Sequence, residues 1–369
     1  MRPLPFRHQW SRRGLARWAA GLVIGVGAIW AVVSAAGGLT DAAHVLGRTE
    51  WAWVMAAIAV EAVSYVAMGL RLRRLARFST DLPRRAAVGL ALVVAGFGLL
   101  TPAAPVEGLT IAGGELRRRG VSQRQAALTL GFGEWFAARS FVLVAAVNIW
   151  VMAMLGDLFA LDVVLVVTTA AVAIVTLVVT ARLARRPAIA ARTADLIGWL
   201  QFWRPRPPAE ERRAAGAKWH RDAMEIVGTP ANRAVLVCLS VIAVLTDMAA
   251  LWASLTAVGV HVQADVVVLG ASAGVLAASV PLLPGGLGLV EAVVPAVLHH
   301  FGAPLDAALA GALLYRALGT FLPAAVGAAV VSGLVIARRK TRLATPFVER
   351  SDLGRRVNPA PDGKGAGQD

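Results

Sequence analysis

The chain has little charge and almost no cysteine, and these two shortages exclude several classes of protein. Only 16% of its 369 residues are Asp, Glu, Lys or Arg, whereas a soluble domain carries about 25%. The single cysteine, Cys238, excludes an intramolecular disulfide and a cysteine-based metal site. The alternating segments of about 10 residues that a transmembrane β-barrel needs are also missing from the sequence.

Long apolar runs take the place of the missing charge. Apolar residues make up 57% of the chain and the mean hydropathy is +0.66. Several runs reach the roughly 20 residues that span the hydrocarbon of a bilayer, so we predict an all-α polytopic membrane protein. The first run is too long for the core of a cleaved signal peptide. About six full spans are expected, at residues 18–37, 51–70, 126–155, 160–181, 232–258 and 307–336.

The basic residues are distributed unevenly along the chain, which has a net charge of +15. Of the 37 Lys and Arg residues, 33 lie in five segments. These segments are 1–17, 71–85, 117–124, 182–231 and 338–369. The short segments between the other span ends hold only Arg48. Because basic loops stay on the cytoplasmic side, this pattern predicts membrane topology rather than nucleic-acid binding, with both termini in the cytoplasm.

The same charge pattern divides the chain into parts. Residues 1–17 are expected to form a cytoplasmic N-terminus and 338–369 a disordered cytoplasmic tail. Residues 18–337 are expected to form the transmembrane domain, with a first half 18–181, a cytoplasmic linker 182–231 and a second half 232–337. High Ala, Arg and Gly content favours a bacterial source, and hence a multi-pass protein of the bacterial inner (cell) membrane.

Two apolar regions are broken by helix-disrupting residues and do not fit as simple spans. The region 86–116 contains Pro102 and Pro105, and the region 264–300 contains Pro281 and the run Pro284 to Gly288. If each region were one full crossing, the basic loop 117–124 would lie outside, against the charge rule. We therefore predict two re-entrant hairpins of opposite orientation, because freed backbone groups persist at membrane depth only where they are buried or line a polar cavity.

The two halves show a weak internal repeat. A shift of 182 positions aligns Pro102 with Pro284, Leu116 with Leu298, and Gly120 with Gly302. The order of elements is also the same in both halves: a broken hairpin, a short turn with glycine, and a long span. Inverted repeats with broken helices are a common architecture of transporters, so we predict that the halves form one.

The break at Pro284-Gly285-Gly286-Leu287-Gly288 is the strongest candidate for a binding site. A half-helix that starts near Gly288 would leave its first N–H groups unpaired and its positive end near the membrane midplane. Such an end favours an anion, for example a lipid phosphate. The alternative is a structural kink satisfied by neighbouring helices. Glu291, in the first turn, is expected to cap the helix, to carry a proton or to bind a cationic headgroup.

In the first half, Glu107 follows Pro102 and Pro105 and is the candidate for an inner polar site. Glu115 is closer to the arginines 117–119, so pairing at the cytoplasmic surface is its expected role. No histidine shows metal-ligand spacing, and no Ser/His/Asp or Cys/His arrangement is recognisable in the sequence. Neither a metal nor a cofactor is therefore expected, and we do not expect an enzyme.

Charged residues inside the long spans require partners. A lone charge near mid-membrane costs about 2.5–3.5 kcal/mol on insertion scales. The 182-residue shift places Glu134 on Arg316, so a pair between them across the pseudo-twofold axis is expected, either as a clamp between repeats or as a pair that opens during transport. Arg316 could instead bind a phosphate, and Tyr315 beside it is a hydrogen-bond donor. The in-span residues with weaker context are Glu61, Asp247 and Arg139.

The second half resembles the transmembrane region of the lysylphosphatidylglycerol synthases and their stand-alone flippase-like relatives. The resemblance rests on the run 284–288 with Glu291 three residues on, on Gly302 after His299-His300-Phe301, and on Tyr315-Arg316. In the first half, Pro102 with Glu107, and then Glu134, are similar to the family's pattern. Val106, Trp135 and Ala138 depart from that pattern, so the first-half site and its ligand are expected to differ.

The resemblance implies movement of a lipid, or a lipid-linked headgroup, between leaflets. The chain ends soon after its last expected span, so the family's cytosolic synthase activity is not expected. The implied partner is an anionic or phosphate-bearing membrane lipid, and the oligomeric state stays open, with a homodimer as one option. Two alternatives remain: an intramembrane lipid-modifying transferase, and a non-transporting scaffold for cell-envelope assembly.

Overall fold

The computed structural model describes residues 47–100, 104–155, 221–222, 224–278, 286–330 and 333. All regular secondary structure in these ranges is helical, which confirms the all-α class. The helices are α3 (Trp51–Ala76), α4 (Arg84–Leu100), α5 (Ala104–Arg118), α6 (Gln123–Leu155), α10 (Pro230–Ala257), α11 (Ala264–Ala278), α12 (Leu289–His300), α13 (Leu305–Arg316) and the π-helical turn η2 (Ala317–Phe321). After η2 an α-helix continues through residues 322–330.

Four helices are long and apolar enough to cross a membrane. They cover Trp51–Ala76, Gln123–Met154, Pro230–Ala257 and Leu305–Val330. The shortest have 26 residues, or about 39 Å at 1.5 Å per residue, which exceeds the roughly 30 Å of bilayer hydrocarbon. They match four of the six predicted spans and define a polytopic membrane protein. The other two, at 18–37 and 160–181, lie outside the described residues.

The described helices repeat in order, with the second set reversed in orientation. Each half contains a long helix, two short helices and another long helix: α3 to α6, then α10 to α13. The equivalent helices α3 and α10 run antiparallel, because Glu50 N–H donates to Ala257 O at 2.8 Å at one end of the pair. At the other end Arg74 Nε donates to Asn232 Oδ1 at 2.7 Å. Antiparallel equivalent helices are what an inverted repeat requires, so these contacts agree with the predicted inverted repeat.

Further polar contacts connect α3 and α10 along their length. Ser64 Oγ donates to Ala243 O at 3.0 Å, and Arg71 NH1 donates to Ser240 Oγ at 3.2 Å. Both contacts are buried. Side chains that hydrogen-bond across helices stabilise packing where no hydrophobic effect drives association. Arg71 was expected in the cytoplasmic basic segment 71–85, but the structure buries it in this interface.

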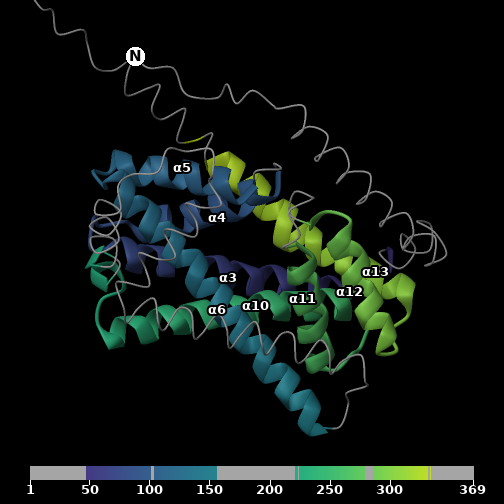
Figure 1. The fold of residues 1–369 in the computed structure, drawn as a ribbon. Coiled ribbons are helices and arrows are strands. Elements are labelled where there is room, and N and C mark those ends of the chain that lie inside the picture. Colours follow the sequence, from purple (N-terminus) through teal and green to yellow (C-terminus); the bar gives the residue numbers. More distant parts are fainter. Residues whose placement is uncertain are drawn as a thin grey trace, which may run out of the picture. The chain divides into compact units, whose positions relative to one another are not determined.

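The short helices pack as two antiparallel pairs, α4 with α5 and α11 with α12 (Figure 1). In the first pair, Gly108 lies so close to α4 that a Cβ atom there would approach Val94 O to 2.7 Å. In the second pair, a Cβ atom on Gly286 would approach Ala278 Cα to 2.5 Å. Pro105, expected to break this region, lies instead in the first turn of α5, where proline is well tolerated.

The two helix pairs return to opposite ends of the molecule. The start of α4 and the end of α5 share one apolar cluster with the end of α3, through Leu72, Ala87 and Leu116. The start of α11 and the end of α12 share another cluster with the end of α10, through Val258 and Leu298. The ends of α3 and α10 lie at opposite ends of their antiparallel pair, so the two short-helix pairs begin and end at opposite ends of the fold.

The lengths of the short helices fit hairpins that stop partway. Helix α4 has 17 residues and α12 has 12, which correspond to about 25 Å and about 18 Å. Both values are below the roughly 30 Å of the hydrocarbon layer. That the pairs are re-entrant in a membrane stays a prediction. The breaking residues Pro102 and Pro281 lie outside the described ranges.

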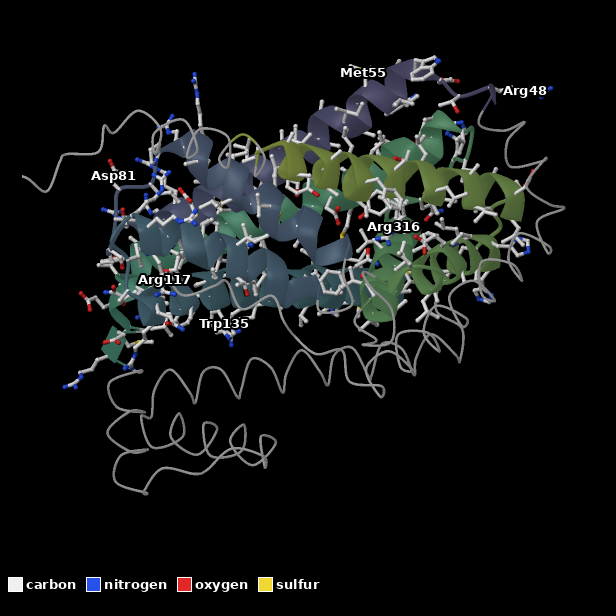
Figure 2. All side chains as sticks on the ribbon, turned by 90° about the horizontal axis from the view of Figure 1, so that it is seen from above. Arg48, Met55, Asp81, Arg117, Trp135 and Arg316 are labelled. Atoms are coloured by element: carbon white, nitrogen blue, oxygen red, sulfur yellow. The ribbon has the colours of Figure 1, made fainter. Side chains whose placement is uncertain are left out.

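Two of the basic segments, 71–85 and 117–124, and the described end of the linker lie at one end of the fold. Figure 2 shows Asp81 and Arg117 at one end and Arg48 at the opposite end. At the first end, Arg124 Nε lies 2.9 Å from Asp222 Oδ2 and so connects the start of α6 to the linker between the halves. The segments 71–85 and 117–124 and the end of the linker therefore share one end, as the charge pattern predicted. Which side of the membrane that end faces stays a prediction.

The last helix of each half packs on the other half. Helix α6 contacts α10 and α11, and the continuation of α13 contacts α3 and α4. In the second case a Cβ atom on Gly96 would approach Ala324 Cα to 2.6 Å, so the two backbones lie in close contact. The turn η2 begins directly after Arg316 in this crossing segment. Single π-helical turns inside α-helices are frequent at functional sites.

Candidate functional site

A tight glycine turn precedes α12 and sets the geometry of its N-terminus. Gly286 and Gly288 have φ angles of 67° and 87°, in the left-handed region that side chains disfavour. The turn points the N–H of Gly288 at the helix's own first turn, where it donates to Glu291 Oε2 at 2.7 Å. Glu291 thus occupies the capping position that its spacing from Gly288 predicted.

The same carboxylate also binds an arginine from the next helix. Arg316 Nε donates to Glu291 Oε1 at 2.8 Å, and Arg316 NH1 donates to Thr320 Oγ1 at 3.2 Å in the π turn. Glu291 and Arg316 are only 4% and 7% exposed, and Figure 2 places Arg316 inside the helix packing. One carboxylate therefore connects the positive end of α12 to the guanidinium on α13.

The expected pair between Glu134 and Arg316 is not formed, which corrects the prediction. Arg316 binds Glu291 in its own half, whereas Glu134 lies on α6 and interacts with the positive charge of Arg71 on α3. The 182-residue shift relates equivalent positions in the two halves. Equivalent positions contact each other only where they lie next to the twofold axis. Arg139, on the same helix, lies over the ring of Trp135, 4.0 Å from its centre, a cation–π geometry.

Beside the Arg316 pair lies a second set of polar contacts that sequence reasoning largely missed. Tyr315 OH donates to Asp247 Oδ1 on α10 at 2.8 Å. Tyr65 OH, on α3, donates to the carbonyl of Gly319 in the π turn at 2.9 Å. The sequence marked Asp247 only as an in-span acid and did not mark Tyr65. An ionisable residue inside a span is a functional candidate by default, and that signal alone pointed to Asp247.

Glu61 completes this group from α3. Its side chain is 5% exposed, and its Oε2 has no hydrogen-bond partner among the described residues. Its Oε1 lies 3.2 Å from the position that a Cβ atom on Gly319 would take. The charge of Asp247 acts on it. We call the whole set the central polar cluster; its members are Glu61, Tyr65, Asp247, Glu291, Tyr315, Arg316 and Thr320.

The other predicted site residues fall away from this cluster or outside the described structure. Pro284 and Gly285 are outside the described residues, as is the side chain of Glu107, whose backbone lies in α5. Glu115 makes ion pairs of 3.7 Å with Arg118 and 3.6 Å with Arg119 at the end of α5, as expected. In the described part of the chain, no group of three His, Cys, Asp or Glu residues is arranged to hold a metal ion.

The central polar cluster combines three carboxylates with one guanidinium. A planar guanidinium can donate two parallel hydrogen bonds to a phosphate or carboxylate, and such charge-assisted bonds are the strong ones. The unpaired N–H groups of a helix N-terminus add a second anion-binding element. Both elements meet at Glu291, so the site is able to hold one anionic group between α12 and α13.

Fold and site together define a polytopic α-helical membrane protein with an inverted repeat and a buried charged cluster. The chain matches the family described as the lysylphosphatidylglycerol synthase TM region over residues 18–327. It belongs to that family, as the resemblance in its motifs predicted. Among the curated proteins compared with it, none matches the chain.

Proposed function

We propose that this protein translocates a lipid or a lipid-linked headgroup between the two leaflets of the membrane. The observation that carries the proposal is the buried carboxylate of Glu291, held by both Gly288 N–H and Arg316 Nε. An anion already occupies the two donors that would bind a headgroup phosphate. Membership of a family of membrane regions from lipid-related synthases supports a lipid as the ligand.

The proposed binding step exchanges one anion for another. The headgroup phosphate takes the guanidinium of Arg316 and the N-terminus of α12, while the Glu291 carboxylate moves aside. Because the two hairpins enter from opposite ends, the region between their tips is the natural place for such an exchange during alternating access. We also propose that Glu107 and the run 284–288 contribute to headgroup binding. The proposal gives the protein no catalytic role.

The test is a reconstituted liposome assay with a fluorescent phosphatidylglycerol probe. Arg316→Ala combined with Glu291→Ala is expected to lower the translocation rate at least about tenfold, because a charge-assisted hydrogen bond contributes about 1.5–3 kcal/mol and each 1.4 kcal/mol is a factor of ten. The matched control is Arg124→Ala with Asp222→Ala, which removes an ion pair of similar length at the end of the fold. The control is expected to keep the wild-type rate.

Three results would count against the proposal. Equal translocation rates in the wild type and in the Arg316→Ala, Glu291→Ala variant would show that these residues do not form the binding site. If the wild type translocated none of the lipids tested, the transport proposal would be contradicted and the scaffold alternative would be favoured. Chemically altered lipid after incubation with the purified protein, detected by mass spectrometry, would favour the transferase alternative.

A further inference from the structure

Glu61 and Asp247 face each other on the two equivalent helices α3 and α10, next to the π turn of α13. Tyr315 OH holds Asp247 Oδ1 at 2.8 Å, and Gly319 lies against Glu61 Oε1. Tyr65 OH interacts with the Glu61 carboxylate but donates its proton to Gly319 O at 2.9 Å. The two carboxylates therefore interact with each other, and among the described residues Tyr315 donates its hydroxyl proton to Asp247.

One carboxylate oxygen of Glu61 has no hydrogen-bond partner among the described residues, which is unusual for a buried acid. Glu61 Oε2 is buried and has no donor within the described residues, although the side chain is only 5% exposed. A buried ionised carboxylate normally has hydrogen-bond donors or a paired cation, because removing the charge from water is costly. A proton on Oε2 removes the charge and makes the oxygen itself a donor.

Among the described residues, no cation is paired with Glu61. From α3 it faces Tyr65, from α10 Asp247, and from α13 Tyr315. The positive charge in the cluster belongs to Arg316, which is bonded to Glu291. On α6, the carboxylate of Glu134 interacts with Arg71, about 15 Å along α3 from Glu61. The described side chains of α4 are ionisable only at its start, at Arg84 and Arg85.

We propose that Glu61, with Asp247, is a proton-binding site whose occupancy is coupled to anion binding at Arg316. In the binding step an O–H bond of hydronium in the adjoining water breaks and leaves water, while one O–H bond forms on Glu61 Oε2; no bond in the protein breaks. With all acids ionised, the cluster holds three negative charges against one positive charge. An anionic headgroup at Arg316 adds further negative charge, so its binding favours the proton and the proton favours its binding.

This coupling rests on the proposed function and supplies its driving force. Coupling between two binding events is reciprocal, and typical coupling free energies correspond to about 5–150-fold changes in affinity. Tyr315 and Arg316 are neighbours on α13, one bonded to Asp247 and the other to Glu291. That adjacency provides a short physical connection between the proton site and the headgroup site. A proton gradient across the membrane would then drive movement of an anionic lipid.

The first experiment compares translocation of fluorescent phosphatidylglycerol in proteoliposomes at acidic and neutral pH. At lipid probe levels low enough for the rate to follow affinity, the wild type is expected to be about 5–150-fold faster at acidic pH. Glu61→Gln supplies a permanent amide donor and is expected to bring the acid-to-neutral ratio to about one. Glu115→Gln, an acid at the end of α5, is the control and is expected to keep the wild-type ratio. A wild-type ratio in Glu61→Gln, or a dependence on sodium instead of pH, would overturn the inference.

The second experiment separates failure of the inference from failure of the proposed function. Infrared difference spectra of the protein in nanodiscs report the carbonyl band of a protonated carboxyl group. The wild type is expected to show a band, lost in Glu61→Gln, whose titration midpoint moves to higher pH when phosphatidylglycerol replaces phosphatidylcholine. Arg316→Ala is expected to abolish that movement.

An equal movement of the midpoint in Arg316→Ala would point to surface charge alone and would overturn the coupling. A wild type without the band would overturn the proton site. A wild type that shows the band but does not translocate lipid would contradict the proposed function and leave the proton site in place.

Discussion

At the scale of single residues, the interior of this protein depends on one carboxylate with two partners. Glu291 accepts from Gly288 N–H and from Arg316 Nε, and both charged side chains are buried. A buried ion pair gains little over apolar packing, but removal of one partner leaves an uncompensated charge. The structural consequence of a substitution here therefore depends on whether the partner is removed as well.

A double-mutant cycle is predicted to show strong coupling between Glu291 and Arg316. Arg316→Ala alone should destabilise the protein by about 3–5 kcal/mol because Glu291 stays buried without its cation. Arg316→Ala with Glu291→Ala should cost less than the sum of the single changes. The midpoint of thermal unfolding in detergent micelles measures each variant.

The control cycle uses Arg124 and Asp222, whose ion pair is more exposed. Exposed pairs contribute about 0–1 kcal/mol, so these variants should unfold near the wild-type temperature and their effects should add. Additive effects at Glu291 and Arg316 as well would show that the two side chains act independently and would contradict the geometry.

At the scale of elements, the start of α12 depends on glycine. Gly288 adopts φ 87°, and Gly286 combines φ 67° with the backbone of Ala278 directly beside it. A side chain at Gly286 would push α11 and α12 apart. A side chain at Gly288 would instead strain the turn that directs the first N–H of α12 toward Glu291.

Alanine substitutions are predicted to separate these two effects. Gly288→Ala should cost about 1–2 kcal/mol from the left-handed backbone, and Gly286→Ala should cost more because it adds a clash with Ala278 Cα. Gly114→Ala is the control, because a Cβ atom there meets nothing within 4 Å and Gly114 lies inside α5. It should be neutral or stabilising by up to about 1 kcal/mol. Thermal unfolding of the three variants tests the order, and an unchanged Gly286→Ala variant would contradict the close helix contact.

The sequence predicted the order of elements better than the partners of side chains. Glycines at 286 and 288 and an acid three residues later signalled where α12 begins, because backbone geometry and capping are local. The partner of Arg316 was predicted wrongly, because contact depends on how α12 and α13 rotate against each other. The contact of Tyr65 with Gly319 joins residues 254 positions apart and passes through a π turn that no periodic pattern announced.

At the scale of the whole molecule, the inverted repeat places each hairpin's two ends at the same end of the fold. Asp81 and Arg118 flank the α4–α5 pair, and His261 and His300 flank the α11–α12 pair. All four side chains are exposed. Such residues allow the topology to be read directly in a native membrane.

Cysteine labelling is predicted to divide these four positions into two groups. In a Cys238→Ser background, which has no other thiol, Asp81→Cys and Arg118→Cys should react with a membrane-impermeant thiol reagent from one side only. His261→Cys and His300→Cys should react only from the opposite side. Gel shift of labelled protein in sealed vesicles of both orientations measures this. If Asp81 and Arg118 reacted from opposite sides, the α4–α5 region would be a single crossing and the hairpin would be excluded.

The hydrogen bonds between α3 and α10 limit how this molecule can change shape. The two helices are joined near both ends and at two points between, through Glu50, Ser64, Arg71 and Arg74. Sliding or separating them would break several bonds at once in a medium that offers no replacement. We therefore expect α3 and α10 to move as one rigid unit. A rearrangement that exposes Arg316 would then move α11, α12 and α13 relative to this pair.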